Sequence, residues 1–412
     1  MIGRALFTSA AAAGAVAVAV YLYRRRKGAP TPASVASTPG RKTKALKEIR
    51  RVDYTTPPIN IESVRLVAKL DEPNASTERG KAVSIIETAL GCYYNPSVPE
   101  SELVLHAEDM DVLEVAVSHQ GKVKSILSPG RDYVYDAEAE TLTIQRAALV
   151  GNGSDVFTLH TVVAIDPEAN KQLQGLFKSS GIFCTQMEAE GYRRMTPHLD
   201  RPDVLSVYTV RIEADAGSCP VLLSNGNRIG TGTLPNGRHF AEYHDPFPKP
   251  SYLFALVAGR LGVLSGQFTT AWAKREVTLN IYTEPECVDQ LEFGMSCIQR
   301  AMRWDEEQFG REYDLDVFNI VAVADFNMGA MENKGLNVFN SKCSWPPTCD
   351  HLRSQAPMAF DCISICPLRR TPTPPRRYVL GMPSTATDAT LRTIQGVIAH
   401  EYFHNCESRL LA

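Results

Sequence analysis

The sequence lacks an excess of charge of either sign. Its 412 residues contain 43 Lys and Arg against 46 Asp and Glu, so the net charge of −3 does not call for a nucleic-acid partner. Ten cysteines over this length are too sparse for a disulfide scaffold, and no internal repeat is visible. With 44% hydrophobic and 22% charged residues the chain can bury a sizeable core, which excludes wholesale disorder. The length predicts two or three domains.

The N-terminus begins with an apolar leader. Residues 5–23 are uncharged and rich in Ala and Val, and this run just meets the length that crosses a membrane. Four basic residues follow directly, so residues 1–27 are predicted to be an apolar leader or a membrane anchor. Because a basic cluster after such a run tends to stay cytosolic, an anchor would leave the remainder of the chain on the cytosolic side. A cleaved signal peptide or an organelle-targeting leader is the alternative. Residues 28–48 are predicted to form a linker.

Two regions of different character follow. Between residues 49 and 259, short β-rich runs such as Leu113–Val117, Val156–Val163 and the alternating Leu205–Ile212 are separated by turn residues. This spacing of strands predicts an antiparallel β-sandwich. From residue 260 to 412 strands and helices are mixed, so we expect an α+β domain there.

The second region has four recognisable elements. Val277–Tyr282 and Val317–Val323 are predicted strands, residues 290–309 form a predicted helix, and Asp388 can cap another. The first helix should bury one face, made of Leu291, Met295, Ile298, Met302 and Phe309. The second carries Leu391, Ile394, Val397, Ile398 and Tyr402 at helical spacing.

A metal-binding pattern lies on the second predicted helix. His400 and His404 are four residues apart, so both imidazoles can face one metal ion. Glu401 is close enough to hold a water at that ion, as the general base does in the H-E-x-x-H arrangement of zinc peptidases. The alternative is a helix that merely carries polar residues.

Two further segments, residues 327–333 and 185–191, could bind a substrate if they lie beside such a metal-binding helix. A strand ending near Ala324 runs into Asn327–Asn333, where Gly329 and Ala330 leave room for another backbone, as in β-augmentation. Glu332 beside that edge could bind a cation at the end of a peptide; an ordinary turn is the alternative. The acidic segment 185–191, followed by 200–203, is either a solvated loop or a set of carboxylates that selects a protonated α-amine.

Together these segments resemble a known family. Gly329-Ala-Met-Glu-Asn333 with His400-Glu-x-x-His404 resembles the signature pair of the zinc aminopeptidases of the aminopeptidase N (alanyl aminopeptidase) family. The segments 222–227, 245–250 and 252–259 resemble its bacterial-type branch. The resemblance runs from about Arg51 to Lys342 and from Tyr378 to Asn405.

The resemblance implies a fold and a set of roles. The α+β domain should be a partial thermolysin-like zinc-peptidase domain, and the substrates should be peptides with a free N-terminus. His400 and His404 would bind one Zn²⁺, and Glu401 would be the general base. Glu188 and Glu332 would hold the substrate amine, and Gln186 and Met328 would line the first side-chain pocket. The substrate-binding set is completed by Gly329, Ala330, Met331 and Asn333.

The sequence departs from this family in two places. The family's third zinc ligand is a Glu about eighteen residues beyond the second His, but only eight residues follow His404. The chain is thus expected to be a C-terminally truncated form that binds zinc poorly and turns over little. Residues 343–377 form an atypical insert with four cysteines, either a surface loop that could bind metal or the product of a faulty gene model, which loop length favours. A faulty gene model would also explain residues 406–412, which do not resemble the family.

Two functions therefore remain open. The first is a zinc aminopeptidase that removes N-terminal residues by metal-activated attack of water. The second is a non-catalytic truncated fragment or a membrane-tethered peptide-binding pseudoenzyme, because two His ligands hold zinc weakly. Zinc stoichiometry and hydrolysis of an alanyl amide separate the two.

Overall fold

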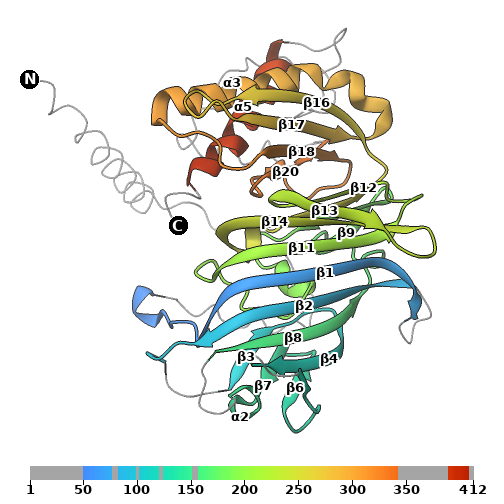
Figure 1. Ribbon diagram of the computed structural model, residues 1–412, viewed down its shortest axis with the longest axis vertical. Coiled ribbons are helices and arrows are strands. Elements are labelled where there is room, and N and C mark those ends of the chain that lie inside the picture. Colours follow the sequence, from blue (N-terminus) through green and yellow to red (C-terminus); the bar gives the residue numbers. More distant parts are fainter. Residues whose placement is uncertain are drawn as a thin grey trace, which may run out of the picture. The chain divides into compact units, whose positions relative to one another are not determined.

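The computed structural model describes residues 50–76, 82–98, 102–119, 124–150, 156–341 and 388–407 (Figure 1). The predicted leader at 1–27, the linker at 28–48, the insert at 343–377 and residues 408–412 lie outside these residues. Among the helices described, none is long and apolar enough to span a membrane. The described residues from Thr56 onward belong to one compact unit. The domain boundary at 259 and the membrane or leader assignment therefore stay predictions.

A large sheet dominates the N-terminal region. Its strands are β1 (Ile59–Ser76), β2 (Ala82–Tyr94), β4 (Asp111–Ser118), β5 (Ser125–Ile126), β8 (Val156–Ile165), β11 (Leu205–Asp215), β13 (Asn227–Thr233) and β14 (Arg238–Pro250). The spatial order is β13-β14-β11-β1-β2-β8-β4-β5. All pairs are antiparallel except β1 with β11, where Val64 lies opposite Tyr208. The predicted sandwich is therefore correct in class, but its main sheet is mixed rather than purely antiparallel.

Two smaller sheets cover the large one. One contains β9 (Gly175–Ser179), β10 (Ile182–Gln186), β12 (Val221–Ser224) and β15 (Leu256–Gly259), in the order β12-β15-β10-β9. The other contains β3 (Leu103–His106), β6 (Tyr133–Asp136) and β7 (Thr141–Ile144), in the order β3-β7-β6. Side chains from all three sheets, such as Leu66, Leu142 and Leu256, share one buried hydrophobic core. Short helical segments connect some of the strands: α2 (Arg146–Leu149), η2 (Tyr192–Arg194) and η3 (Ser251–Leu253). A further short segment, η1 (Arg51–Asp53), precedes β1 in the sequence.

A five-stranded sheet forms the second region. It contains β16 (Gly262–Thr269), β17 (Glu276–Thr283), β18 (Val317–Val323), β19 (Ala330–Met331) and β20 (Leu336–Asn340), in the order β16-β17-β18-β20-β19. The β17–β18 and β18–β20 pairs are parallel. Val317–Val323 is a nearly continuous apolar run because this central strand is buried on both faces.

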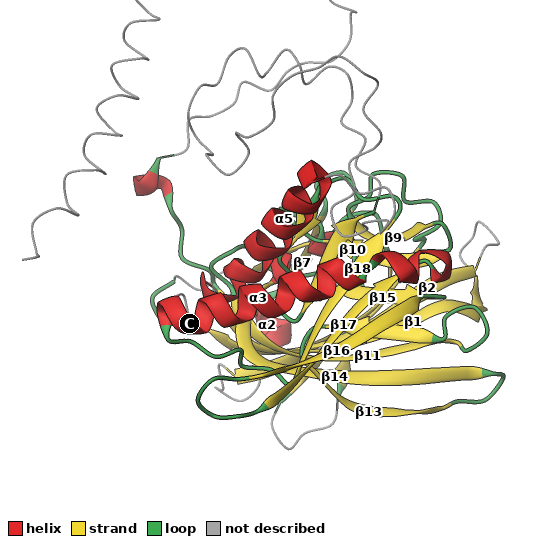
Figure 2. Ribbon diagram, turned by 90° about the horizontal axis from the view of Figure 1, so that it is seen from above, coloured by secondary structure: helices red, strands yellow, loops and turns green. Residues whose placement is uncertain are grey.

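Two helices pack against one face of this sheet (Figure 1, Figure 2). They are α3 (Glu292–Phe309), preceded by η4 (Pro285–Gln290), and α5 (Asp388–Glu407). Four residues of the predicted apolar face of α3 are buried, but Phe309 is 49% exposed. Phe309 does not share the burial of the other four residues, because its ring instead contacts the rings of Trp304 and Phe403.

The opposite face of the five-stranded sheet packs against the four-stranded sheet. Val321 and Val338 share a buried cluster with Phe177 and Val257. This packing holds β18 and β19 against the β9–β10 hairpin: Ser179 Oγ donates a hydrogen bond to Asp325 Oδ2 at 3.2 Å. The β9–β10 turn and the chain following β18 therefore meet.

Candidate metal and active site

Helix α5 places two imidazoles side by side. The Nε2 atoms of His400 and His404 are 3.2 Å apart, and their ring centroids are 4.8 Å apart. Two ligands at 2.0–2.1 Å from a tetrahedral zinc ion lie roughly 3.3 Å from each other. The pair therefore has the spacing that one shared ion requires.

The apolar face of α5 fixes the direction of this pair. Ile394, Ile398 and Tyr402 are buried in the core shared with α3 and the sheet. The ring of Tyr402 packs edge-on against Phe318 at 5.5 Å. Because these side chains face the sheet, His400 is left exposed and His404 is half-buried.

The segment after β18 brings a carboxylate to the helix. The ligand atoms of Glu332, Glu401 and His404 all lie within 4.8 Å of one another. Glu332 follows β19, which pairs with β20 on one side and is the edge strand of the sheet within the described residues. Gly329, just before β19, accepts a hydrogen bond from Asn340 N at 3.0 Å. An edge strand thus runs directly into the acidic cluster.

The end of β10 supplies the other wall. Gln186 is 1% exposed, and its Nε2 donates to the Glu188 carbonyl at 3.2 Å and to the Met328 sulfur at 3.1 Å. The Met331 sulfur lies 3.8 Å from the same nitrogen. The solvated-loop interpretation is therefore wrong for residues 185–187, which are buried.

The carboxylates of the cluster influence one another. Burial raises the pKa of Glu401 to about 8, and the negative charges of Glu332 and Glu188 add to that effect. Burial, and then Glu332, also raise the pKa of Glu188, whereas His404 lowers it. Three acidic groups at this spacing favour a bound cation, because a cation would offset their mutual repulsion.

The donor atoms fit a zinc ion. Two imidazole nitrogens and nearby carboxylate oxygens are ligands that zinc prefers. Their chemistry and the spacing of the two Nε2 atoms agree, so the residues present can hold the ion that the sequence predicts.

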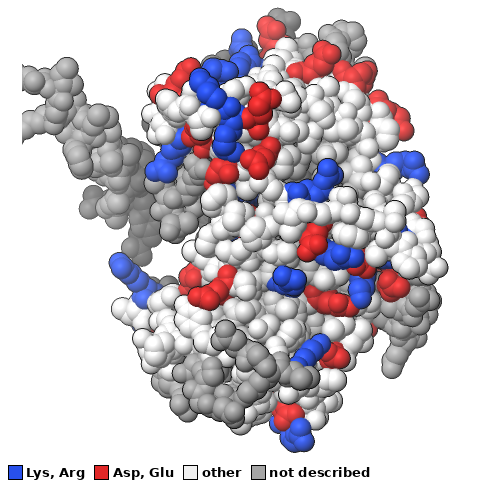
Figure 3. Space-filling view, viewed as in Figure 1, with Lys and Arg blue, Asp and Glu red and all other residues white. Residues whose placement is uncertain are grey.

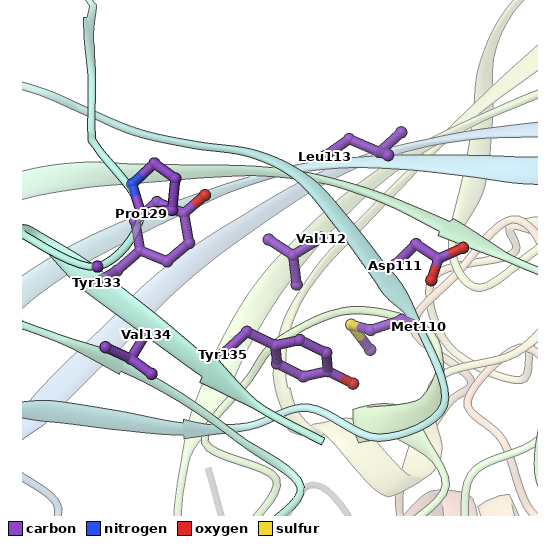
Figure 4. Close-up of a pocket in the computed structure, with 9 residues that line it drawn as sticks. Met110, Asp111, Val112, Leu113, Pro129, Tyr133, Val134 and Tyr135 are labelled. Carbon is purple, nitrogen blue, oxygen red and sulfur yellow. The ribbon is translucent and has the colours of Figure 1, made fainter. Parts of the chain in front are cut away.

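A cavity elsewhere in the molecule lacks this chemistry. A cavity of about 550 Å³ is lined by residues of β4 and β6 such as Val112, Leu113 and Tyr135, which Figure 4 labels. None of the predicted site residues lines it. Figure 3 shows acidic and basic side chains intermixed on the face in view. The His–Glu cluster is therefore the stronger candidate.

The structure brings most predicted site residues together. His400, His404, Glu401, Glu332 and Glu188 form the cluster, with Gln186, Met328 and Met331 in contact beside it. Ala330 pairs with Phe339, and Asn333 is 1% exposed. Asp200 of the second acidic segment is instead bonded to Ser251 Oγ at 2.6 Å.

Sequence reasoning missed two residues that flank the motifs. Lys334 follows Asn333, Asn405 follows His404, and the Lys334 Nζ lies 3.4 Å from the Asn405 Oδ1. Adjacency to the motifs was the available signal. Nothing in the local pattern shows that the two side chains meet.

Two family models match parts of this chain. Residues 78–253 match the peptidase M1 N-terminal domain, and residues 293–348 match the peptidase family M1 domain. Helix α5 lies C-terminal to both matched ranges.

Two similar bacterial relatives carry the same name. Aminopeptidase N of Caulobacter vibrioides is 44% identical over 88% of this chain and 35% of its own length, and that of Escherichia coli is 39% identical over 86% and 34%. The crystal structure of Legionella pneumophila aminopeptidase A in complex with aspartic acid superimposes with a TM-score of 0.68 at 27% identity, covering 86% of this chain and 35% of that one. The chain thus spans about a third of the length of these relatives. On these matches and this fold, the chain belongs to peptidase family M1.

Proposed function

We propose that this chain carries the metal-binding and substrate-anchoring residues of a zinc aminopeptidase, which removes N-terminal residues from peptides. The observation that carries the proposal is the convergence of two imidazoles and three carboxylates beside an edge strand. The names of the relatives support the same reaction.

The two outer carboxylates would select the substrate by its amine. Glu188 and Glu332 influence each other electrostatically, so a protonated α-amine between them would relieve repulsion that burial makes costly. A peptide anchored in this way presents its first peptide bond to the His pair, which limits cleavage to the first residue.

Backbone and side-chain contacts would align the rest of the peptide. Among the described residues β19 pairs with a strand on one side only, and its other side could pair with an extended chain, as in β-augmentation. Gln186 and Met328, already in contact, would line the pocket for the first side chain. A thioether is adaptable, so the pocket should accept several apolar side chains.

Glu401 would move the proton. Its raised pKa keeps it protonated at neutral pH without a cation, and a neighbouring cation favours the ionised form that can accept a proton from water. Zinc bound at His400 and His404 would supply Lewis-acid activation of the peptide carbonyl and of water. Glu401 could then pass the proton to the leaving amine.

A pair of substrates tests the proposal. The zinc-loaded chain is incubated with alanyl-p-nitroanilide and with its N-acetylated twin, and zinc content is measured alongside. We expect low turnover, with cleavage of the free-amine substrate alone. With zinc in excess, Glu332→Gln should reduce turnover far more than zinc content, because saturating metal masks a moderate loss of zinc affinity. Equal cleavage of both substrates would contradict amine anchoring. Absence of both zinc and turnover would favour the non-catalytic peptide-binding alternative.

A further inference from the structure

Lys334 is a buried cation beside the site that the proposed chemistry does not use. It is 4% exposed, and its Nζ donates to Asp314 Oδ2 at 2.8 Å and to Asn405 Oδ1 at 3.4 Å. The same ammonium lies 4.6 Å from the centre of the Phe247 ring. One side chain therefore contacts three segments that are distant in the sequence.

The backbone at Lys334 is also held. Asn225 Nδ2 donates to the Lys334 carbonyl at 2.8 Å, and Asn225 Oδ1 accepts from Ala255 N at 2.7 Å. Gly335 follows with a φ of +71°, and a Cβ there would lie 2.9 Å from a methyl carbon of Leu315. The turn after Glu332 is thus fixed against the four-stranded sheet by its backbone and against α5 by the Lys334 side chain.

The arrangement joins the two motifs of the site. Lys334 lies two residues after Glu332, and Asn405 lies one residue after His404 in the last turn of α5. A buried ion pair adds little to stability compared with apolar packing, so its value here lies in fixing a geometry. The geometry at stake is the position of the Glu332 carboxylate relative to the imidazoles.

We propose that Lys334 is a positioning residue for Glu332: by bonding Asp314 and Asn405 it holds the Glu332 loop against α5, so that this carboxylate faces the ion at His400 and His404. The proposal rests on the zinc site proposed above. When Lys334 is removed, a positioning role and a purely electrostatic role predict opposite changes in zinc affinity. Removal of a cation near a metal site should strengthen metal binding, whereas loss of the Glu332 position should weaken it.

The test is a set of zinc dissociation constants, measured by competition with a chromophoric chelator on the full chain. Lys334→Met removes the ammonium, and the milder Asn405→Ala removes only the bond to α5. Each is made in the wild type and in the Glu332→Gln background. Arg392→Met, which removes an exposed cation of α5, is the matched control.

We expect Lys334→Met to weaken zinc binding about tenfold, as loss of a group that orients metal-site residues does, and Asn405→Ala to weaken it by a smaller factor. In the Glu332→Gln background both losses should shrink to less than about twofold, because the residue being positioned no longer carries its charge. Arg392→Met should leave the constant unchanged.

Two results would overturn the inference while leaving the zinc site intact. One is tighter zinc binding by Lys334→Met. The other is an equal loss with and without the Glu332 charge, which would indicate a general structural defect. A wild-type chain without zinc affinity would refute the proposed zinc site itself, and the inference with it.

Discussion

The raised pKa of Glu401 makes the metal-free chain sensitive to pH. Glu401 is 7% exposed, and its pKa is about 8 instead of 4.5 because of burial and the charges of Glu332 and Glu188. The folded chain therefore holds a proton on Glu401 that the unfolded chain releases above its ordinary pKa. Glu401→Gln mimics the protonated form at every pH, so comparison of the two proteins isolates this one group.

The sign follows from linkage. Between pH 4.5 and about 8 the folded state binds more protons than the unfolded state, so the free energy of unfolding falls as pH rises through this window. At 1.36 kcal/mol per pKa unit, the full effect is a few kcal/mol, with an upper bound of about 5 kcal/mol. Glu401→Gln should be close to wild type near pH 5 and more stable by a few kcal/mol above pH 8.

Urea unfolding at pH 5, 7 and 9 with EDTA measures this difference. Glu307→Gln, an exposed change on α3, is the matched control and should show no such trend. A difference between Glu401→Gln and wild type that stays flat from pH 5 to 9 would refute the reasoning. Added zinc should shrink the difference at high pH, because a cation stabilises the ionised carboxylate.

Three further predictions use other residues. Glu188→Gln removes one of the charges that raise the pKa of Glu401, so the pH at which stability changes should move down in the same unfolding series; no movement would count against their coupling. Tyr402→Ala removes a ring packed on Phe318 and should destabilise the chain by about 3–5 kcal/mol in calorimetry, whereas a loss below about 1 kcal/mol would show that α5 is anchored elsewhere. His198 is fully buried and burial lowers its pKa to about 4, so stability should fall as pH drops from about 6.5 toward 4. His198→Phe should lose that part of the acid sensitivity in a pH-dependent thermal scan, and an unchanged acid profile would contradict it.

Much of the fold could be predicted, because a strand or helix that buries one face repeats its apolar residues at a fixed spacing in the sequence. Val317–Val323 matches β18 residue for residue, and the alternating Leu205–Ile212 lies within β11. The parallel pairing of β1 with β11 could not be predicted, since strand periodicity does not specify a partner more than a hundred residues away. Phe309 has helical spacing, but it lies at the last turn of α3, beyond the edge of the sheet core.

The site was predictable where the chemistry is local. His400, Glu401 and His404 belong to one helical turn, so their spacing alone implied a common ligand. The burial of residues 185–187 was not visible, because it depends on β15 and on Met328 and Met331 far along the chain. Lys334 was missed for the same reason: its partners come from three distant segments.

X-ray absorption at the zinc edge of the zinc-loaded chain tests the central claim most directly. The account predicts nitrogen or oxygen neighbours at about 2.0–2.1 Å with the outer-shell pattern of two imidazoles. Both imidazole contributions should decrease in His400→Ala and His404→Ala. A first shell of sulfur at about 2.3 Å, as the four cysteines between residues 343 and 366 would give, would contradict it.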